Sequence, residues 1–175
     1  MRITISGPPG SGTTTLAYRL AEKHNLKLVS AGEAFRQLAR EKGMDLAEFS
    51  RLAESDLAID ALIDARQKEI AEQQDDIIVE GRLSGWMVEH ADLKIWLTAP
   101  LSTRSKRIAE RDGGDEYAAR SKTETREESE RSRYRNYYKI NIDDLSPYQI
   151  VLDSSLWNKD ELTEIVDLAV TYLKK

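Results

Sequence analysis

The chain of 175 residues has no cysteine, and its two histidines, His24 and His90, stand far apart in the sequence and are expected on the surface. The lack of cysteine excludes a disulfide framework, a thiolate zinc site and a thiol nucleophile. The sequence also lacks an apolar run of membrane length and a basic-then-apolar leader, so we expect a cytoplasmic protein that does not enter membranes. The net charge of −5 argues against general binding to nucleic acid or to anionic lipid.

The composition is typical of a folded domain with a polar surface, because 40% of the residues are hydrophobic and 33% are charged. The length is sufficient for one well-packed domain and short for two. We therefore expect a single domain over residues 1–175, and a monomer is the simple expectation for this size.

The first fifteen residues follow the order of strand, glycine-rich turn and helix. Residues 2–6 read RITIS, a short segment whose apolar residues are Ile3 and Ile5, and residues 7–15 read GPPGSGTTT. This order matches the phosphate-binding loop pattern G-x-x-x-x-G-K-[ST]. Glycines let the backbone approach a phosphate closely, and the N–H groups and the helix dipole then stabilise its charge. The predicted ATP-binding residues of this segment are Gly7, Pro8, Pro9, Gly10, Ser11, Gly12, Thr13, Thr14 and Thr15.

One residue departs from that pattern, since Thr13 stands where the lysine is expected. A unit charge about 4 Å from a phosphate is worth roughly 4 kcal/mol at an effective dielectric constant near 20, so the loss matters. Thr14 keeps the hydroxyl that holds Mg²⁺ in such loops. A turn that merely joins strand to helix is the plain alternative, and the three glycines and two prolines argue against it.

Five short apolar segments alternate with stretches of helical periodicity. Continuous apolar strands separated by helices indicate parallel pairing with both faces covered. We predict an α/β, three-layer P-loop NTPase fold, in which a five-stranded parallel sheet binds ligands at the carboxyl ends of its strands. The expected strands are residues 2–6, 26–29, 77–79, 93–98 and 148–152. Residues 44 to about 73 are expected to form two helices with a break near Ser55 and Asp56.

Arginine is concentrated in one part of this acidic chain. Residues 104–139 contain 11 of the 26 basic residues, eight of them arginine, against eight acidic residues. Arginine suits a planar, bidentate grip on phosphate. Two explanations fit this composition equally well: the segment binds a local anionic ligand, or it is a solvent-exposed helix with many ion pairs.

Polar clusters follow each of the first four expected strands. The phosphate loop follows the first, residues 30–36 the second, residues 80–82 the third and the arginine-rich segment the fourth. In a parallel sheet these positions converge at one rim, so their arginines could face one polyanion. Phosphoryl transfer requires such an arrangement, because its catalysis is mainly positioning and neutralisation of charge.

Together these motifs resemble the nucleoside monophosphate kinases, and most closely the cytidylate kinases of the archaeal type. The resemblance covers essentially the whole chain, and the order and spacing of the motifs make it specific. It rests on residues 7–15, residues 30–32 with Arg36, residues 80–82, residues 107–111 and residues 126–135.

The resemblance implies ATP-dependent phosphorylation of CMP and dCMP, with ATP and a nucleoside monophosphate as partners and Mg²⁺ as cofactor. It implies a helical acceptor-binding region over about residues 31–74 and an arginine-rich lid over about residues 112–135. Arg107 would lie against the adenine, and Arg111 would reach the ATP phosphates. The acceptor-binding residues would be Ser30, Gly32, Arg36, Gly81 and Arg82.

The resemblance also assigns the catalytic groups. Thr14 and, through bound water, Glu80 would hold the metal, while Glu130 would be a charge partner in the lid. The catalytic arginines would be Arg82, Arg126, Arg131 and Arg133, of which the last three would close over the transferring phosphoryl group. Plain alternatives are that Glu80 only caps or forms an ion pair, and that single lid arginines face solvent or pair with neighbouring glutamates.

The lid arginines suggest how the charge missing at Thr13 is replaced, since they could supply it when the lid closes. Two other functions stay open at this point. One is a kinase of the same fold that phosphorylates AMP, UMP or dTMP, because base choice depends on a few hydrogen bonds in the acceptor pocket. The other is a catalytically weak ATP-binding protein in which Thr13 marks a degenerate loop.

Overall fold

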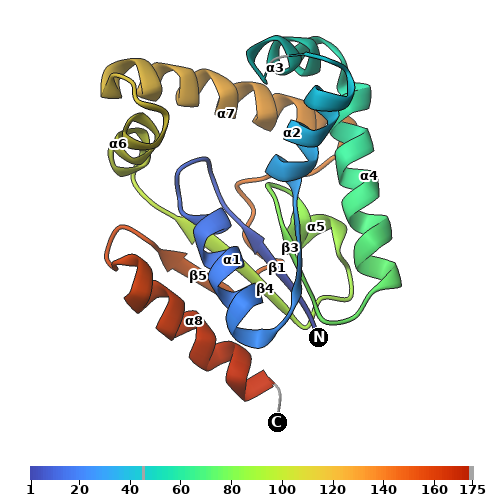
Figure 1. The fold of residues 1–175 in the computed structure, drawn as a ribbon, viewed down its shortest axis with the longest axis vertical. Helices are drawn as coiled ribbons and strands as arrows, with labels where there is room; N and C mark the ends of the chain where they lie inside the picture. Colours follow the sequence, from blue (N-terminus) through green and yellow to red (C-terminus); the bar gives the residue numbers. More distant parts are fainter. Residues whose placement is uncertain (45, 174–175) are drawn as a thin grey trace.

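The computed structural model describes residues 1–44 and 46–173 of the chain. This part of the chain is built on a five-stranded parallel sheet with strand order β2-β3-β1-β4-β5 (Figure 1). The predicted fold class is therefore confirmed. The strands are β1 (Arg2–Ser6), β2 (Lys27–Ser30), β3 (Ile77–Glu80), β4 (Leu93–Thr98) and β5 (Ile150–Asp153).

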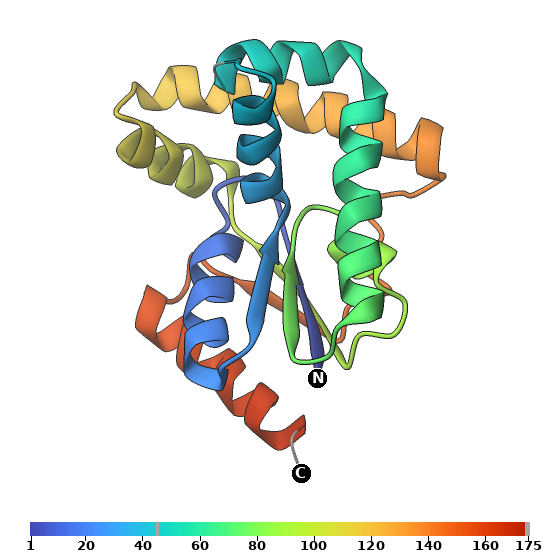
Figure 2. The ribbon, with the colours of Figure 1, turned by 45° about the vertical axis from the view of Figure 1, so that its right-hand side comes forward.

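Helices connect the strands and cover both faces of the sheet, as Figure 2 shows from a second direction. Helix α7 runs across the end of the molecule where the strands finish, and the N-terminus lies at the opposite end (Figures 1 and 2). The helices are α1 (Thr13–His24), α2 (Ala31–Glu41), α3 (Leu46–Ser55), α4 (Leu57–Gln73), α5 (Ser84–Met87), α6 (Leu101–Asp112), α7 (Glu116–Tyr138) and α8 (Lys159–Leu173).

The main core lies between the sheet and the pair of helices α1 and α8. Ile3 and Ile5 of β1 and Ile95 and Leu97 of β4 point to this side and are fully buried. Successive side chains of a strand alternate between faces, so Trp96 points to the other face, where it packs on Tyr148. Both faces of β4 are thus covered at its centre, which is why residues 95–97 read as a continuous apolar run.

Helices α2, α3 and α4 have a smaller core of their own. Phe49 of α3 is fully buried at its centre and packs on Phe35 of α2, with ring centroids 4.8 Å apart. The predicted break between the last two helices is confirmed, because α3 ends at Ser55 and the side chain of Asp56 caps α4 by accepting a hydrogen bond from the N–H of Ala58.

Three details differ from the sequence expectations. The fifth strand begins at Ile150, because Tyr148 lies in a turn closed by its N–H bond to Leu145 and uses its ring in the core. The short helix α5 was not predicted. His24 was expected on the surface, but its side chain is largely covered and its Nε2 lies 2.7 Å from Oδ1 of Asp167, which joins α1 to α8.

Within the described ranges, 1–44 and 46–173, the structure contains no helix that is both long enough and apolar enough to cross a membrane.

Replacing Phe49 with alanine removes the centre of the small helical core and leaves a cavity there. We expect the free energy of unfolding to fall by about 3–5 kcal/mol, as for other buried phenylalanines. The matched control is Leu62→Ala on α4, whose side chain is 52% exposed and which should change stability by less than about 1 kcal/mol. Urea unfolding of the three proteins tests this, and equal losses in both variants would contradict it.

Candidate phosphate-binding site

The glycine-rich loop between β1 and α1 has the geometry of a phosphate cradle. Gly10 and Gly12 have positive φ angles of 82° and 97°, and α1 begins directly afterwards at Thr13. A Cβ on Gly10 would also lie 2.7 Å from the carbonyl oxygen of Arg104, so this position requires glycine for space as well as for conformation. The loop thus ends at the N-terminus of a helix, which favours a bound anion.

The carboxylate of Glu80 joins this loop to the end of β2. Its Oε1 accepts hydrogen bonds from Thr13 Oγ1 at 2.7 Å and Thr14 Oγ1 at 3.3 Å, and its Oε2 accepts one from Ser30 Oγ at 2.6 Å. Gln67 of α4 fixes the backbone of Glu80 by donating to its carbonyl oxygen at 2.9 Å. Thr13, in the lysine position, is therefore a partner of a carboxylate in this structure.

Of the residues expected to bind the acceptor, Ser30 bonds to the same carboxylate and Gly81 follows it in the chain, Gly32 and Arg36 lie next to Ser30 along α2, and Arg82 bonds to Glu130 instead. Ser30 caps α2 and accepts a hydrogen bond from the N–H of Glu33 at 3.4 Å. The guanidinium of Arg36 lies over the next turn, since a Cβ on Gly32 would be 3.5 Å from its Nη1. Gly81 is packed closely, because a Cβ there would be 3.0 Å from the Cβ of Ala31.

A second buried carboxylate, Glu130 of α7, brings together two of the predicted catalytic arginines. Its Oε2 accepts a hydrogen bond from Arg82 Nε at 2.6 Å, and its Oε1 accepts one from Arg126 Nε at 2.7 Å. The Glu130 side chain is only 4% exposed. Burial alone would raise the pKa of Glu130, but the two guanidinium groups outweigh it and hold the pKa at about 2.

The other lid arginines lie apart from this pair. Arg133 donates to Ser129 Oγ at 2.7 Å, one turn back along α7. Arg131 pairs with Asp143 at 2.9 Å, on the surface. On a helix with about 100° per residue, Arg126 and Arg133 share one flank of α7, and Arg131 lies on the opposite flank. The structure thus places these three arginines on two sides of the helix.

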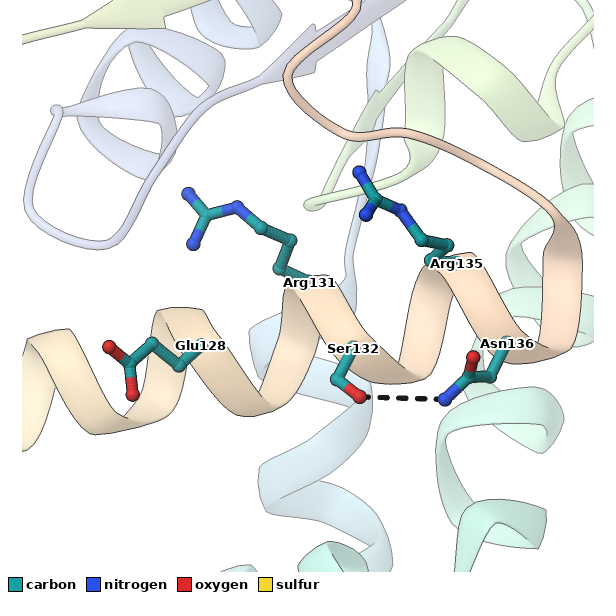
Figure 3. Close-up of a pocket in the computed structure, with 5 residues that line it drawn as sticks. All are labelled: Glu128, Arg131, Ser132, Arg135 and Asn136. Carbon is teal, nitrogen blue, oxygen red and sulfur yellow. Dashed lines mark hydrogen bonds between the residues drawn. The ribbon is translucent and has the colours of Figure 1, made fainter.

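A pocket on α7 is lined by only one of the predicted site residues, Arg131. Figure 3 shows Arg131 and Arg135 leaving the helix on the same side, one turn apart. All five residues that line the pocket come from this one helix: Glu128, Arg131, Ser132, Arg135 and Asn136. The phosphate loop contributes nothing to this pocket, which is therefore distinct from the phosphate-binding site.

The two arginines of α6 that were expected to contact ATP differ in their surroundings. Arg107 donates from Nη1 to Ser154 Oγ at 2.9 Å and from Nη2 to the Ser154 carbonyl at 2.8 Å, and its Nη1 also reaches the carbonyl of Gly10 at 3.4 Å. Its guanidinium plane is therefore fixed next to the loop. Arg111 is exposed and pairs with its neighbour Asp112 at 2.7 Å.

Sequence reasoning singled out neither Arg104 nor Glu127, which form an ion pair between α6 and α7 in which Arg104 is buried and Glu127 is partly buried. Arg104 donates from Nε to the carbonyl of Ala99 at 2.9 Å and from Nη1 to the carbonyl of Pro9, in the phosphate loop, at 3.1 Å. Its position soon after a strand is the same signal that pointed to Arg82. Among eight arginines in one segment, that signal did not single it out.

Comparisons of the sequence with a family model and with curated proteins agree with each other. The sequence model of the cytidylate kinase-like family matches residues 2–156. A cytidylate kinase of Methanosphaerula palustris is 62% identical over 175 residues, covering 99% of each chain. One of Methanoculleus marisnigri is 63% identical, covering 100% of this chain and 97% of its own.

Solved structures show the same fold at lower identity. An uncharacterised protein from Eubacterium ventriosum superposes with a TM-score of 0.70 at 20% identity, covering 100% of this chain and 99% of its own. A shikimate kinase from Bacteroides thetaiotaomicron gives 0.63 at 13% identity, covering 99% and 97%.

Replacing Glu130 with glutamine tests the ion pairs that it forms. The folded-state pKa of about 2 lies below the ordinary value of 4.5, so the pairs stabilise the fold above pH 4.5 and lose this effect as the pH falls toward 2. We expect Glu130→Gln to lower the free energy of unfolding by about 3 kcal/mol at neutral pH, and the gap to the unmodified protein to close in acid.

Glu124→Gln provides the control, because Glu124 forms an exposed i,i+4 pair with Arg120 on the same helix. It should behave as the unmodified protein in urea unfolding from pH 7 to pH 3. A gap for Glu130→Gln that stays constant with pH would contradict the assigned pKa.

Proposed function

The chain belongs to the cytidylate kinase-like family, and on this premise we propose that it transfers the γ-phosphoryl group of ATP to CMP. An oxygen of the CMP phosphate attacks the γ-phosphorus, and the bond from that phosphorus to the bridging oxygen of the β-phosphate breaks. The products are CDP and ADP. We propose dCMP as a second acceptor.

The observation that carries this proposal is the junction at Glu80. One carboxylate accepts hydrogen bonds from Thr13 and Thr14 of the phosphate loop and from Ser30 at the start of α2. A donor nucleotide on the loop and an acceptor beside α2 would therefore meet next to Glu80. Such proximity supplies much of the catalysis in phosphoryl transfer, since the protein needs to do little covalent chemistry.

We assign the arginines by their place around this junction. Arg36 and Arg82 would bind the acceptor phosphate, and Ser30, Gly32 and Gly81 would line its pocket. Guanidinium groups suit this task, since they bind phosphate oxygens in a bidentate fashion. Because Arg82 is bonded to Glu130 in the structure, the acceptor phosphate would compete with a carboxylate for the same donor.

The lid arginines Arg126, Arg131 and Arg133 would neutralise the charge of the transferring phosphoryl group. In our proposal they replace the charge absent at Thr13, whose hydroxyl is turned to Glu80. Arg126 and Arg133 already share a flank of α7, whereas Arg131 would first have to leave Asp143.

On the donor side, the loop of residues 7–15 would bind the ATP phosphates. The fixed guanidinium plane of Arg107 suits stacking against the adenine ring, because arginine stacks well on aromatic faces. Arg111, which is exposed, would reach the phosphates.

The oxygen ligands at the junction fit Mg²⁺, which prefers hydroxyl, carboxylate and phosphate oxygens. Thr14 Oγ1 and, through water, the Glu80 carboxylate would hold it together with the nucleotide phosphates. Residues 1–44 and 46–173 contain no cluster of three or more His, Cys, Asp or Glu that could bind a metal alone, which suits an ion that arrives with ATP. When bound, Mg²⁺ supplies charge stabilisation to the phosphates.

We further propose that the enzyme acts as a cytoplasmic monomer and binds neither nucleic acid nor membranes. These points follow from its composition and size. Size-exclusion chromatography with light scattering tests whether the enzyme is a monomer.

Turnover with a panel of acceptors tests the proposed reaction. With Mg²⁺-ATP we expect kcat/KM for CMP to exceed that for UMP, AMP and dTMP by at least about 100-fold, since polar contacts to the base discriminate strongly. Preference for another acceptor would retain the mechanism and overturn the base assignment. ATP binding without turnover on any acceptor would indicate a catalytically weak binding protein instead.

Single alanine substitutions of the lid arginines test their role. We expect Arg126→Ala and Arg133→Ala to lower kcat by about 100-fold or more, as for other groups that stabilise transferring phosphoryl charge. Arg131→Ala should lower kcat less, because Arg131 has to leave its surface pair first. If all three left kcat within a factor of a few, the lid arginines would not be the source of the missing charge.

A further inference from the structure

Arg104 is the most completely bonded buried cation near the phosphate loop. Its side chain is 7% exposed, and its guanidinium donates to the carbonyls of Ala99 and Pro9 and, from Nη1 and Nη2, to both oxygens of Glu127. These bonds use four of its five N–H groups. An arginine bonded in this way has little capacity left for a ligand, so its effect on a ligand has to pass through the groups that it holds.

One of those groups belongs to the phosphate loop itself. The bond from Nη1 to the Pro9 carbonyl is 3.1 Å long, and α6 also packs so closely on the loop that a Cβ on Gly10 would lie 3.0 Å from the Cβ of Arg104. The loop lacks the lysine of the usual pattern, and Thr13 is bonded to Glu80. A cation that orders this loop is therefore provided from outside it, by α6.

The other group belongs to the helix that crosses the site. Glu127 and Glu130 lie on the same side of α7, one turn apart, where Glu130 is buried and Glu127 is partly buried. Glu127 binds Arg104 beside the phosphate loop, and Glu130 binds Arg82 at the end of β3. Two carboxylates of one helix thus hold arginines from two separate parts of the site, one on the donor side and one on the acceptor side.

We propose that Arg104 is a positioning residue for the donor nucleotide: it fixes the phosphate loop through the Pro9 carbonyl and makes the shape of that loop depend on α7 through Glu127. This proposal rests on the proposed function for the identity of donor and acceptor. It assigns Arg104 no contact with the reacting atoms.

The test is direct binding, measured by isothermal titration calorimetry with Mg²⁺ and a non-hydrolysable ATP analogue, and separately with CMP. Glu127→Gln keeps the size of the side chain and removes its charge. We expect its Kd for the analogue to rise about tenfold or more, as for small displacements of binding groups, while its Kd for CMP changes less than about twofold. Glu130→Gln should act on the other ligand: because it removes the carboxylate that competes for Arg82, it should lower the Kd for CMP more than it changes the Kd for the analogue.

Three further proteins make the test specific. Arg104→Lys keeps the charge but loses the bidentate fork, so it should also weaken the analogue. The double variant Arg104→Lys/Glu127→Gln should bind the analogue about as well as the weaker single variant, since the two residues act as one unit. Glu124→Gln, which removes only the exposed pair with Arg120, should bind both ligands normally.

An ion pair that merely stabilises the fold would give a different result. In that case Glu127→Gln would lower the Tm but leave both Kd values unchanged, or weaken both ligands equally, and either outcome would overturn the proposal. If Arg104→Lys does not fold, Glu127→Gln and Glu127→Asp decide the question alone. The binding assay does not measure turnover, so the two proposals can fail separately. If Glu127→Gln weakens binding of the analogue alone and the enzyme turns over an acceptor other than CMP, only the base assignment is refuted. If the enzyme turns over CMP but Glu127→Gln does not weaken the analogue more than it weakens CMP, only the role of Arg104 is refuted.

Discussion

A site that binds polyphosphate has to gather positive charge, and that charge must be neutralised when no phosphate is bound. In this chain carboxylates of α7 provide the neutralisation: the buried Glu130 pairs with Arg82 and Arg126, and the partly buried Glu127 pairs with Arg104. Removing one member of such a buried pair leaves an unpaired charge in a poorly solvated place, which is costly. The position of α7 therefore depends in part on Arg82 and Arg126, which we propose also bind nucleotide phosphates.

The threonine in the phosphate loop can be understood within the same arrangement. A lysine at position 13 would place a cation next to Glu80, whereas the threonine hydroxyl donates one hydrogen bond to it at 2.7 Å. Glu80 then remains a shared acceptor for the loop and for Ser30. The cationic contacts to the loop come instead from α6, where Arg104 and Arg107 donate to the carbonyls of Pro9 and Gly10.

The sequence predicted the parts of this site that are local in the chain. The strand, turn and helix around residues 2–15 are specified by apolar and glycine spacing, and Arg82 could be proposed as a site residue because it lies just after the end of β3. Tertiary contacts decided the rest. The fifth strand starts two residues later than expected, because the ring of Tyr148 packs on Trp96 in the core. Which arginines of one long polar segment pair with Glu127 or Glu130 depends on how α6 and α7 meet, and residue spacing alone does not reveal this.

The central claim is that carboxylates and phosphates compete for the same arginines, and a crystal structure with both CMP and a non-hydrolysable ATP analogue bound tests it most directly. Our account predicts that Arg82 and Arg126 leave Glu130 and contact nucleotide phosphates, while Arg104 stays on the Pro9 carbonyl and on Glu127. If Arg82 and Arg126 remained on Glu130 while other side chains bound the phosphates, the account would be contradicted.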